Sequence, residues 1–434
     1  MDVAVVGCGY VGLVTGATLA SLGHTVVGID TDRARLEAIG AGRSPFYEPG
    51  LDDLLRASLE RGTFSIASTL DRAPAADVVL LAVQTPPRED GSIETRYIED
   101  AARALADALE GAPLRRRVVA IRSTVPPGTN ERRVAPLLAP VHDLAVVSNP
   151  EFLREGTAVD DLLRTDRIVI GSNEAWAADV MSRLYEPIGA PVVVTSPATA
   201  ELAKYVSNAF LATLVSFSNE IARLSELTPG VDVEEVLGIV HSDRRLAPEG
   251  RPAPIVAFLR AGCGYGGSCL PKDIAGLSCY GRSLGEPTQL LDAVASVNAG
   301  QALRLVRLAE AALGQLDGHR IAVLGAAFKA GTDDLRHSPA RQVVSELDAR
   351  RASVVVYDPL VSQEALEAWV PSGVAVAATL DDALQGAAAC LVTTAAPEWE
   401  ALDGHKAHPL VVDGRRALDP ARYDGRYVAI GKAP

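Results

Sequence analysis

The chain has 434 residues, 48% of them hydrophobic and 22% charged, which is enough for two to four domains with well-formed cores. A formal net charge of −14 argues against nucleic acid or an anionic membrane surface as a partner. The five cysteines are odd in number and scattered, which argues against a disulfide framework or a metal site and favours a reducing cytoplasm. We expect no signal peptide, because residues 2–6 already resemble a strand, and no membrane span.

The opening of the chain has the pattern of a dinucleotide-binding domain. It consists of a strand, a glycine motif, a helix, a second strand and an acid, at residues 3–6, 7–12, 13–22, 25–29 and Asp30. The motif GCGYVG would place a pyrophosphate at the helix N-terminus, and the acid would bind an adenosine ribose. Asp30 would repel a 2′-phosphate, so NAD is preferred, although Arg33 and Arg35 leave NADP open. Another nucleotide is the alternative.

Four more apolar strands follow the glycine motif. We expect them at residues 77–83, 117–122, 144–147 and 167–171. Ligands of parallel α/β sheets bind beyond the carboxyl ends of the strands. Thr85, Thr124, Glu151 and Glu155 follow such ends and are therefore expected to line a site. Each of them alone could instead serve the geometry of a turn.

The middle of the chain is helical. The segment 200–224 has helical spacing and is mostly apolar, so we expect it to be largely buried. Lys204 and Asn208 are four residues apart and share a face of this helix. They either point into a cleft or form a snorkelling lysine and a helix–helix hydrogen bond. A second long helix is expected at residues 288–313, and such a block often supplies dimer contacts.

Residues 262–273 read GCGYGGSCLPKD. The glycines allow the backbone to approach a ligand closely or to adopt positive φ. The thiol of Cys269, with Lys272 and Asp273 beside it, has the components of an activated nucleophile with a proton-handling partner. The alternative is a glycine-rich turn around a buried, inert cysteine.

The last third repeats the opening pattern after a boundary near residues 313–319. Strands are expected at residues 320–325, 354–357, 389–394 and 410–413, with an acid at Asp358. The loop after the first of these strands carries Lys329 and Arg336 in place of glycines. These cations suit phosphates or a base, or they form surface ion pairs with Asp333 and Asp334. The expected fold class is α/β, with two Rossmann-like, doubly wound domains joined by a central helical domain.

Seven motifs, in order along nearly the whole chain, resemble those of the nucleotide-sugar dehydrogenases, the UDP-glucose/GDP-mannose dehydrogenase family. They are GCGYVG at 7–12, STVPPGT at 123–129, NPEFLREGTA at 149–158, ELAKYVSNAF at 201–210, GYGGSCLPKD at 264–273, FKAGTDDLRHSP at 328–339 and VVDGRR at 411–416. The resemblance implies three domains. They are an NAD-binding domain at 1–195, a central helical domain at 196–312 that forms a homodimer and holds the cysteine loop, and a nucleotide-sugar-binding domain at 318–434.

The resemblance also implies the reaction. It is a four-electron oxidation of the C6 alcohol of a nucleotide sugar to a carboxylate with two NAD, most closely UDP-glucose to UDP-glucuronate. The sugar would pass through a thiohemiacetal and a thioester on Cys269. GDP-mannose, dTDP-glucose and UDP-N-acetylhexosamines are rival substrates. An idle nucleotide-sugar sensor would be expected to have lost Cys269, Lys204 or Asp273, and a two-electron hydroxyacid dehydrogenase would need no cysteine.

Three sets of site residues follow from the resemblance. The catalytic set, in which Lys204 and Asn208 stabilise oxyanions and Asp273 and Glu151 handle protons, is Cys269, Lys204, Asp273, Asn208, Glu151 and Thr124. The cofactor-binding set is Gly7, Gly9, Tyr10, Val11, Gly12, Asp30, Arg35, Thr85, Thr124, Glu155, Lys272 and Arg336. The substrate-binding set is Glu151, Phe152, Leu153, Lys204, Asn208, Arg260, Gly266 and Lys329.

Two positions depart from the family pattern. Ala253-Pro254-Ile255 stands where UDP-glucose members usually carry Arg-Ile-Gly, whose arginine reaches the substrate of a neighbouring subunit. Arg251 is a nearby candidate for that arginine. Tyr265 replaces the usual phenylalanine of the glycine loop, and Arg260 fits either a UDP-sugar or a GDP-mannose enzyme. The sugar and the base therefore stay open at this point.

Overall fold

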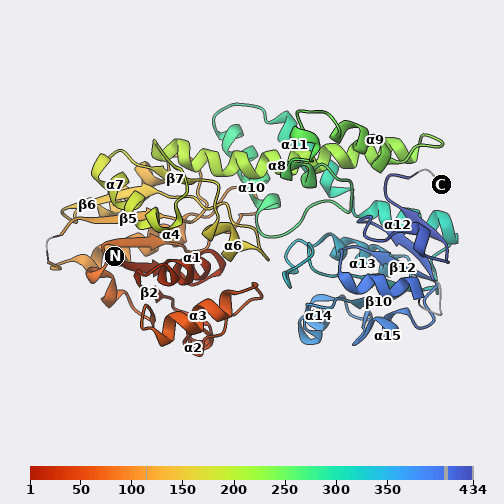
Figure 1. Cartoon of the computed structure of the whole chain (residues 1–434), viewed down its shortest axis with the longest axis horizontal. Coiled ribbons are helices and arrows are strands. Elements are labelled where there is room, and N and C mark those ends of the chain that lie inside the picture. Colours follow the sequence, from red (N-terminus) through yellow and green to blue (C-terminus); the bar gives the residue numbers. More distant parts are fainter. Residues whose placement is uncertain (114, 405–408, 433–434) are drawn as a thin grey trace. The chain divides into compact units, whose positions relative to one another are not determined.

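The computed structural model describes residues 1–113, 115–404 and 409–432. Residues 114, 405–408 and 433–434, which the expected first and third domains include, lie outside the described residues. The chain divides into two compact units, residues 1–207 and 208–434 (Figure 1). No helix of the described residues is both long and apolar enough to cross a membrane.

Unit 1 is built on an eight-stranded sheet with the order β3-β2-β1-β4-β5-β6-β7-β8. The strands are β1 (Asp2–Val6), β2 (Thr25–Ile29), β3 (Phe64–Ala67), β4 (Val78–Leu81), β5 (Arg117–Ile121), β6 (Leu144–Ser148), β7 (Ile168–Gly171) and β8 (Val192–Thr195). Neighbouring strands are parallel except β6 and β7, where Ser148 is opposite Gly171 in an antiparallel pair. The expected strands are confirmed, whereas β3 and β8 were not predicted.

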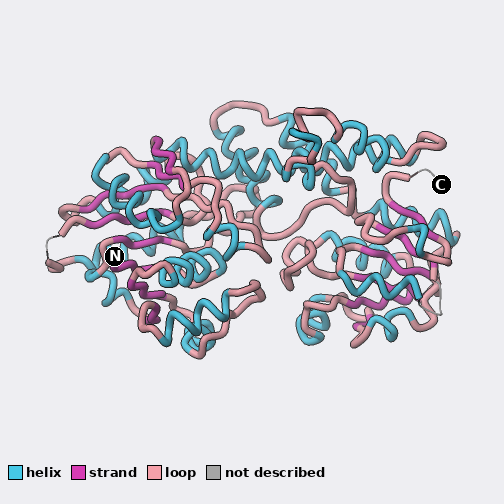
Figure 2. The backbone as a smooth tube through the Cα atoms, in the orientation of Figure 1, coloured by secondary structure: helices cyan, strands magenta, loops and turns pink. Residues whose placement is uncertain are grey.

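Helices cover both faces of this sheet (Figure 2). Alternate residues of β1 show why, since Val3 and Val5 face one apolar cluster and Ala4 and Val6 face the other. The first cluster is closed by α1 (Tyr10–Ser21), α2 (Arg33–Gly40), α3 (Leu51–Glu60), α6 (Ala158–Leu163) and α7 (Ala175–Tyr185). The second is closed by α4 (Arg96–Leu109), η2 (Asn130–Val134) and α5 (Ala135–Leu138). Strands buried on both faces are typical of a Rossmann-like sheet.

Helix α8 (Pro197–Glu226) is one continuous helix of 30 residues that includes the boundary between the units (Figure 1). The expectation that this helix is largely buried is wrong for one of its faces. Several of its large apolar side chains are exposed, with Phe210 at 55%, Phe217 at 52% and Leu224 at 57%. Its buried positions hold mostly small or polar residues, among them Ala209, Ala212, Ser216, Asn219 and Ala222. Small side chains allow close packing, so apolar content alone did not indicate which face is covered.

The remaining helices of the middle block belong to unit 2. They are α9 (Val233–His241), α10 (Leu270–Ser283), α11 (Gln289–Ala299) and α12 (Leu303–Leu313). The single helix expected at 288–313 is wrong, because the chain breaks at Gly300, the C-cap of α11. The break turns Asn298 and Gln301 onto the glycine loop, where they bond the backbone of Tyr265 and Gly262. These contacts outweigh the helical periodicity of the segment.

The sheet of unit 2 has six parallel strands in the order β11-β10-β9-β12-β13-β14. They are β9 (Arg320–Leu324), β10 (Ser353–Tyr357), β11 (Ala375–Val376), β12 (Ala389–Val392), β13 (Leu410–Asp413) and β14 (Tyr427–Ala429). One face packs against α12, α13 (Pro339–Ala349) and α14 (Gln363–Trp369), and the other against α15 (Leu380–Leu384) and η6 (Pro397–Gly404). The order matches that of the first six strands of unit 1, which confirms the expected pair of Rossmann-like sheets. The short β11 and β14 were not predicted.

Candidate active site

The glycine motif of unit 1 has the geometry that a pyrophosphate needs. Gly7 adopts φ +95°, and a Cβ on Gly12 would lie 1.8 Å from the carbonyl oxygen of Gly7, so α1 packs against the turn only with glycine there. A Cβ on Gly9, in contrast, would meet nothing within 4 Å. The open side of Gly9 lies at the start of α1, where Tyr10 and Val11 begin a turn whose N–H groups have no intrahelical partners. The motif therefore fits a dinucleotide.

Asp30, at the end of β2, is tied to the motif. Its carboxylate accepts hydrogen bonds from the N–H of Cys8 at 2.7 Å, the N–H of Asp32 at 3.0 Å and the guanidinium of Arg35 at 2.8 Å. Burial alone would raise the pKa of Asp30, but these donors outweigh burial and hold the pKa below its ordinary value. An ionised acid beside the motif suits ribose hydroxyl groups, and Arg35 lies beside this acid.

Glu151 and Lys204 form a buried ion pair at 3.0 Å, with side chains 6% and 4% exposed. Glu151 also accepts the N–H of Leu153 at 2.5 Å. Burial alone would raise the pKa of Glu151, yet Lys204, the Leu153 N–H and Arg122 together lower it. Glu151 is therefore an ionised, weakly basic carboxylate. Lys204 also lies 5.6 Å from the ring centroid of Phe152, so these residues of the two predicted sets are brought together.

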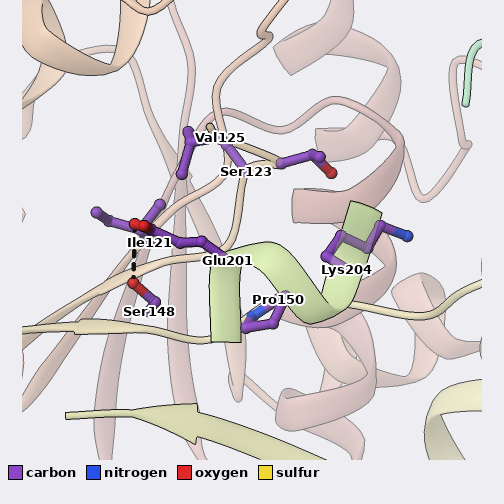
Figure 3. A pocket seen from close by; sticks show the side chains of 8 residues that line it. Ile121, Ser123, Val125, Ser148, Pro150, Glu201 and Lys204 are labelled. Carbon is purple, nitrogen blue, oxygen red and sulfur yellow. Dashed lines mark hydrogen bonds between the residues drawn. The ribbon is translucent and has the colours of Figure 1, made fainter. Parts of the chain in front are cut away.

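The loop after β5 lies beside this pair. The hydroxyl of Thr85 donates to the carbonyl of Thr124 at 2.8 Å, which fixes the loop to the end of β4. Thr124 lines a small pocket together with Ser123, Pro150, Lys204 and other residues (Figure 3). Glu155 is half-buried on the same loop as Glu151. The structure thus gathers the strand-end residues that the sequence singled out at one end of the sheet.

Glu48 is a residue of this region that the sequence reasoning missed. Its buried carboxylate accepts hydrogen bonds from the Tyr10 hydroxyl and from the N–H groups of Gly156 and Ala158, both at 2.7 Å. Glu48 therefore joins the start of α1 to the loop that carries Glu151. Because its partners are distant in sequence, the sequence around Glu48 shows only an acid in a loop with Pro45 and Pro49.

In unit 2, Cys269 directly precedes α10 and is only half-buried. A helix N-terminus favours the thiolate. Its neighbour Ser268 places a hydroxyl oxygen 3.5 Å from the sulfur. Two fully buried cysteines provide a contrast, since burial raises the pKa of Cys263 to about 11 and that of Cys390 to about 12. Cys269 is thus not buried in a core, as the alternative interpretation expected.

Asp273 organises the first turn of α10. Its carboxylate is 1% exposed and accepts hydrogen bonds from the amide of Asn208 and the ammonium of Lys272, each at 2.6 Å. Three residues of the predicted sets are therefore joined, one helical turn from the thiol. Asn208 is four residues after Lys204 on α8, as the sequence predicted.

The glycine loop before Cys269 packs against the loop that carries Lys329. A Cβ on Gly266 would lie 2.3 Å from the carbonyl oxygen of His337, and the N–H of Gly267 donates to the carbonyl of Arg336 at 3.0 Å. Gly266 is thus needed for close packing, and the two motifs of unit 2 lie side by side. The Arg336 side chain forms an exposed ion pair with Asp334, as the surface alternative expected, and Arg260 is exposed.

The chain matches known proteins over most of its length. Residues 1–189, 198–300 and 322–420 match the NAD binding, central and UDP binding domains of the UDP-glucose/GDP-mannose dehydrogenase family. The chain is 39% identical to UDP-glucose 6-dehydrogenase of Rhizobium meliloti over 100% of both chains, and 37% identical to that of Bacillus subtilis (YwqF) over 100% of this chain and 98% of the relative. A solved UDP-glucose dehydrogenase from Pyrobaculum islandicum is 38% identical with a TM-score of 0.92, covering 100% of this chain and 98% of that one. The chain therefore belongs to the UDP-glucose/GDP-mannose dehydrogenase family and is an NAD-dependent oxidoreductase.

Proposed function

We propose that this protein oxidises the C6 alcohol of UDP-glucose to the carboxylate of UDP-glucuronate with two NAD per sugar. The names of its relatives supply the sugar, and the thiol at the start of α10 supplies the means for the second oxidation. We also propose the three-domain division at 1–195, 196–312 and 318–434 and the three sets of site residues named from the sequence.

The glycine motif, Asp30 and Arg35 would hold NAD, with Thr85, Glu155 and Lys272 shaping its site. NAD, when bound, accepts a hydride from C6 in each oxidation. The second oxidation needs an sp³ carbon that carries an oxyanion, which an aldehyde lacks. The Cys269 thiolate supplies it by adding to the aldehyde carbon, giving a thiohemiacetal that becomes a thioester on loss of hydride. Water then displaces the thiolate and releases the carboxylate.

The charged groups suit this sequence of intermediates. Lys204 is a buried cation and Asn208 an amide donor, and both would stabilise the negative oxygen of the thiohemiacetal and of the hydrolytic intermediate. Asp273 would carry protons released from the alcohol and from water. Glu151 has a lowered pKa, so its main role would be to hold Lys204 in place.

The observation that carries the proposal is the buried carboxylate of Asp273, which binds Asn208 and Lys272 one turn after a half-buried thiol at a helix N-terminus. A two-electron dehydrogenase would have no use for this thiol.

The test is the amount of NADH formed per molecule of limiting UDP-glucose, with GDP-mannose and dTDP-glucose run alongside. We expect two NADH from UDP-glucose. One NADH would mean that the reaction stops at the aldehyde and would overturn the role of Cys269. Two NADH from another sugar and none from UDP-glucose would keep the chemistry, move the specificity, and direct attention to Ala253-Pro254-Ile255.

We further propose that the chain forms a homodimer through α8 and works in the cytoplasm. The apolar side chains of Phe210, Phe217 and Leu224 recur every seven residues and are each more than half exposed. Such a row on one helix is typical of a surface that a second copy covers. All five cysteines are free, which suits a reducing compartment.

A further inference from the structure

Glu201, in the first turns of α8, has no role in the mechanism above. Glu201 is only 3% exposed and lies one helical turn before Lys204. The carboxylate accepts hydrogen bonds from the N–H of Gly128 at 2.5 Å, the N–H of Asn130 at 2.9 Å and the hydroxyl of Ser148 at 3.2 Å. Figure 3 shows it reaching from α8 toward Ser148, with Lys204 on the adjacent part of the same helix.

Each contact of Glu201 leads to a segment that carries a proposed site residue. Gly128 follows Thr124 on the loop after β5, Asn130 begins η2 directly after that loop, and Ser148 is the last residue of β6, three before Glu151. The amide of Asn130 also donates to the Ser148 hydroxyl at 3.1 Å, which closes a small ring of hydrogen bonds around the carboxylate. One side chain therefore joins two strand ends to the helix that carries Lys204.

A carboxylate is the side chain that this arrangement requires, because three donors converge on it and it can accept from all of them. The cations on the surrounding elements are held by other groups. Lys204 pairs with Glu151, Arg122 donates to carbonyls of Asn149 and Pro150, and Arg132 donates to the carbonyl of Pro127. Burial raises the pKa of Glu201 to about 7, against the opposing effect of the Ser148 hydroxyl and the backbone N–H groups of residues 128–130.

We propose that Glu201 is a positioning residue of the oxidation, which holds the loop after β5 and the end of β6 against α8 and so sets where Thr124 and Lys204 lie. The inference rests on the proposed function for its kinetic consequence, but its structural part stands on the contacts of Glu201 alone.

The test compares Glu201→Gln with Glu60→Gln, an exposed position at the end of α3. Glutamine keeps the size but turns an N–H group toward the donors. We expect kcat with UDP-glucose to fall at least about tenfold in Glu201→Gln, since small displacements of catalytic groups have large effects on rate. The KM for UDP-glucose should change by less than about threefold, because the substrate-binding set also includes Arg260, Gly266 and Lys329, which lie outside the segments that Glu201 joins. The kcat of the wild type should depend on pH near pH 7, and this dependence should be absent in Glu201→Gln.

Hydrogen exchange of the resting protein tests the structural part without substrate. We expect faster exchange at Gly128 and Asn130 in Glu201→Gln, with β5 and β6 unchanged, and no change in Glu60→Gln. Ser148→Ala should give a smaller defect in kcat, and the double variant should be less impaired than the sum of the two single effects.

Unchanged exchange at Gly128 and Asn130 would overturn the inference, whatever the activity. Wild-type kcat and pH profile in Glu201→Gln would also overturn it. If the wild type oxidises no nucleotide sugar, the proposed function fails, and the exchange measurement still decides whether Glu201 holds the loop.

Discussion

The thiol of Cys269 lies at a helix start, whereas Cys8, Cys263 and Cys390 are buried in cores where their pKa values are raised. We predict that Cys269→Ala lowers formation of the carboxylate at least about a thousandfold, because the covalent intermediate cannot form. Mass spectrometry of the sugar product and NADH absorbance would measure this. Cys279→Ala, on the same helix, is the control. Complete acid formation by Cys269→Ala would refute the covalent route.

The raised pKa of Glu201 also predicts how the stability of the protein depends on pH. Its pKa is about 7 in the folded chain against an ordinary value of 4.5, so the folded state binds more protons between these pH values. Its contribution to the free energy of unfolding must therefore fall as pH rises through this window, by roughly 3 kcal/mol if the full shift is realised. The wild type should lose more thermal stability between pH 5 and pH 8 than Glu201→Gln. Parallel melting-temperature profiles of the two proteins would contradict the raised pKa.

At the scale of elements, we expect two glycines of one motif to have different roles, Gly9 in cofactor binding and Gly12 in folding. A Cβ on Gly12 would collide with the Gly7 carbonyl, but a Cβ on Gly9 meets only open space. We predict that Gly9→Ala leaves the melting temperature unchanged and lowers the affinity for NAD at least about tenfold, because the pyrophosphate must approach the backbone there. Gly12→Ala should lower the melting temperature by displacing α1. Titration calorimetry and scanning calorimetry measure the two effects, and unchanged NAD affinity in Gly9→Ala would place the pyrophosphate elsewhere.

The same scale shows what the sequence could predict. The strands around the motifs followed from apolar runs, and Cys269, Lys272 and Asp273 followed from their spacing. The break at Gly300 did not, because Asn298 and Gln301 bond a loop some 35 residues earlier in the chain. Glu48 and Glu201 were missed for a related reason. Their partners are mostly backbone N–H groups of distant segments. Because nearly every residue type has this group, the sequence does not indicate which residues will donate it.

For the whole molecule, the exposed row on α8 predicts self-association. Phe217→Glu should raise the dimer dissociation constant at least about tenfold, because a carboxylate would lose water in the contact. Sedimentation should give twice the chain mass of 45.5 kDa for the wild type and for Leu284→Glu, an exposed apolar control outside α8. A wild-type protein that sediments as a monomer at micromolar concentration would contradict the dimer.

The two sheets share a strand order, and each has an acid after its second strand, Asp30 and Asp358. Asp358 accepts four backbone N–H groups, from Ala326 and Ala327 on one oxygen and from Leu360 and Val361 on the other. All of its lone-pair positions are therefore occupied by its own chain. Asp30 takes one of its three donors from the side chain of Arg35, which is 34% exposed. We therefore expect Asp358 to hold only the backbone of its own domain, whereas Asp30 can exchange the guanidinium of Arg35 for a hydroxyl group of a bound ribose. Two domains with the same strand order can thus differ in the ligand that they bind.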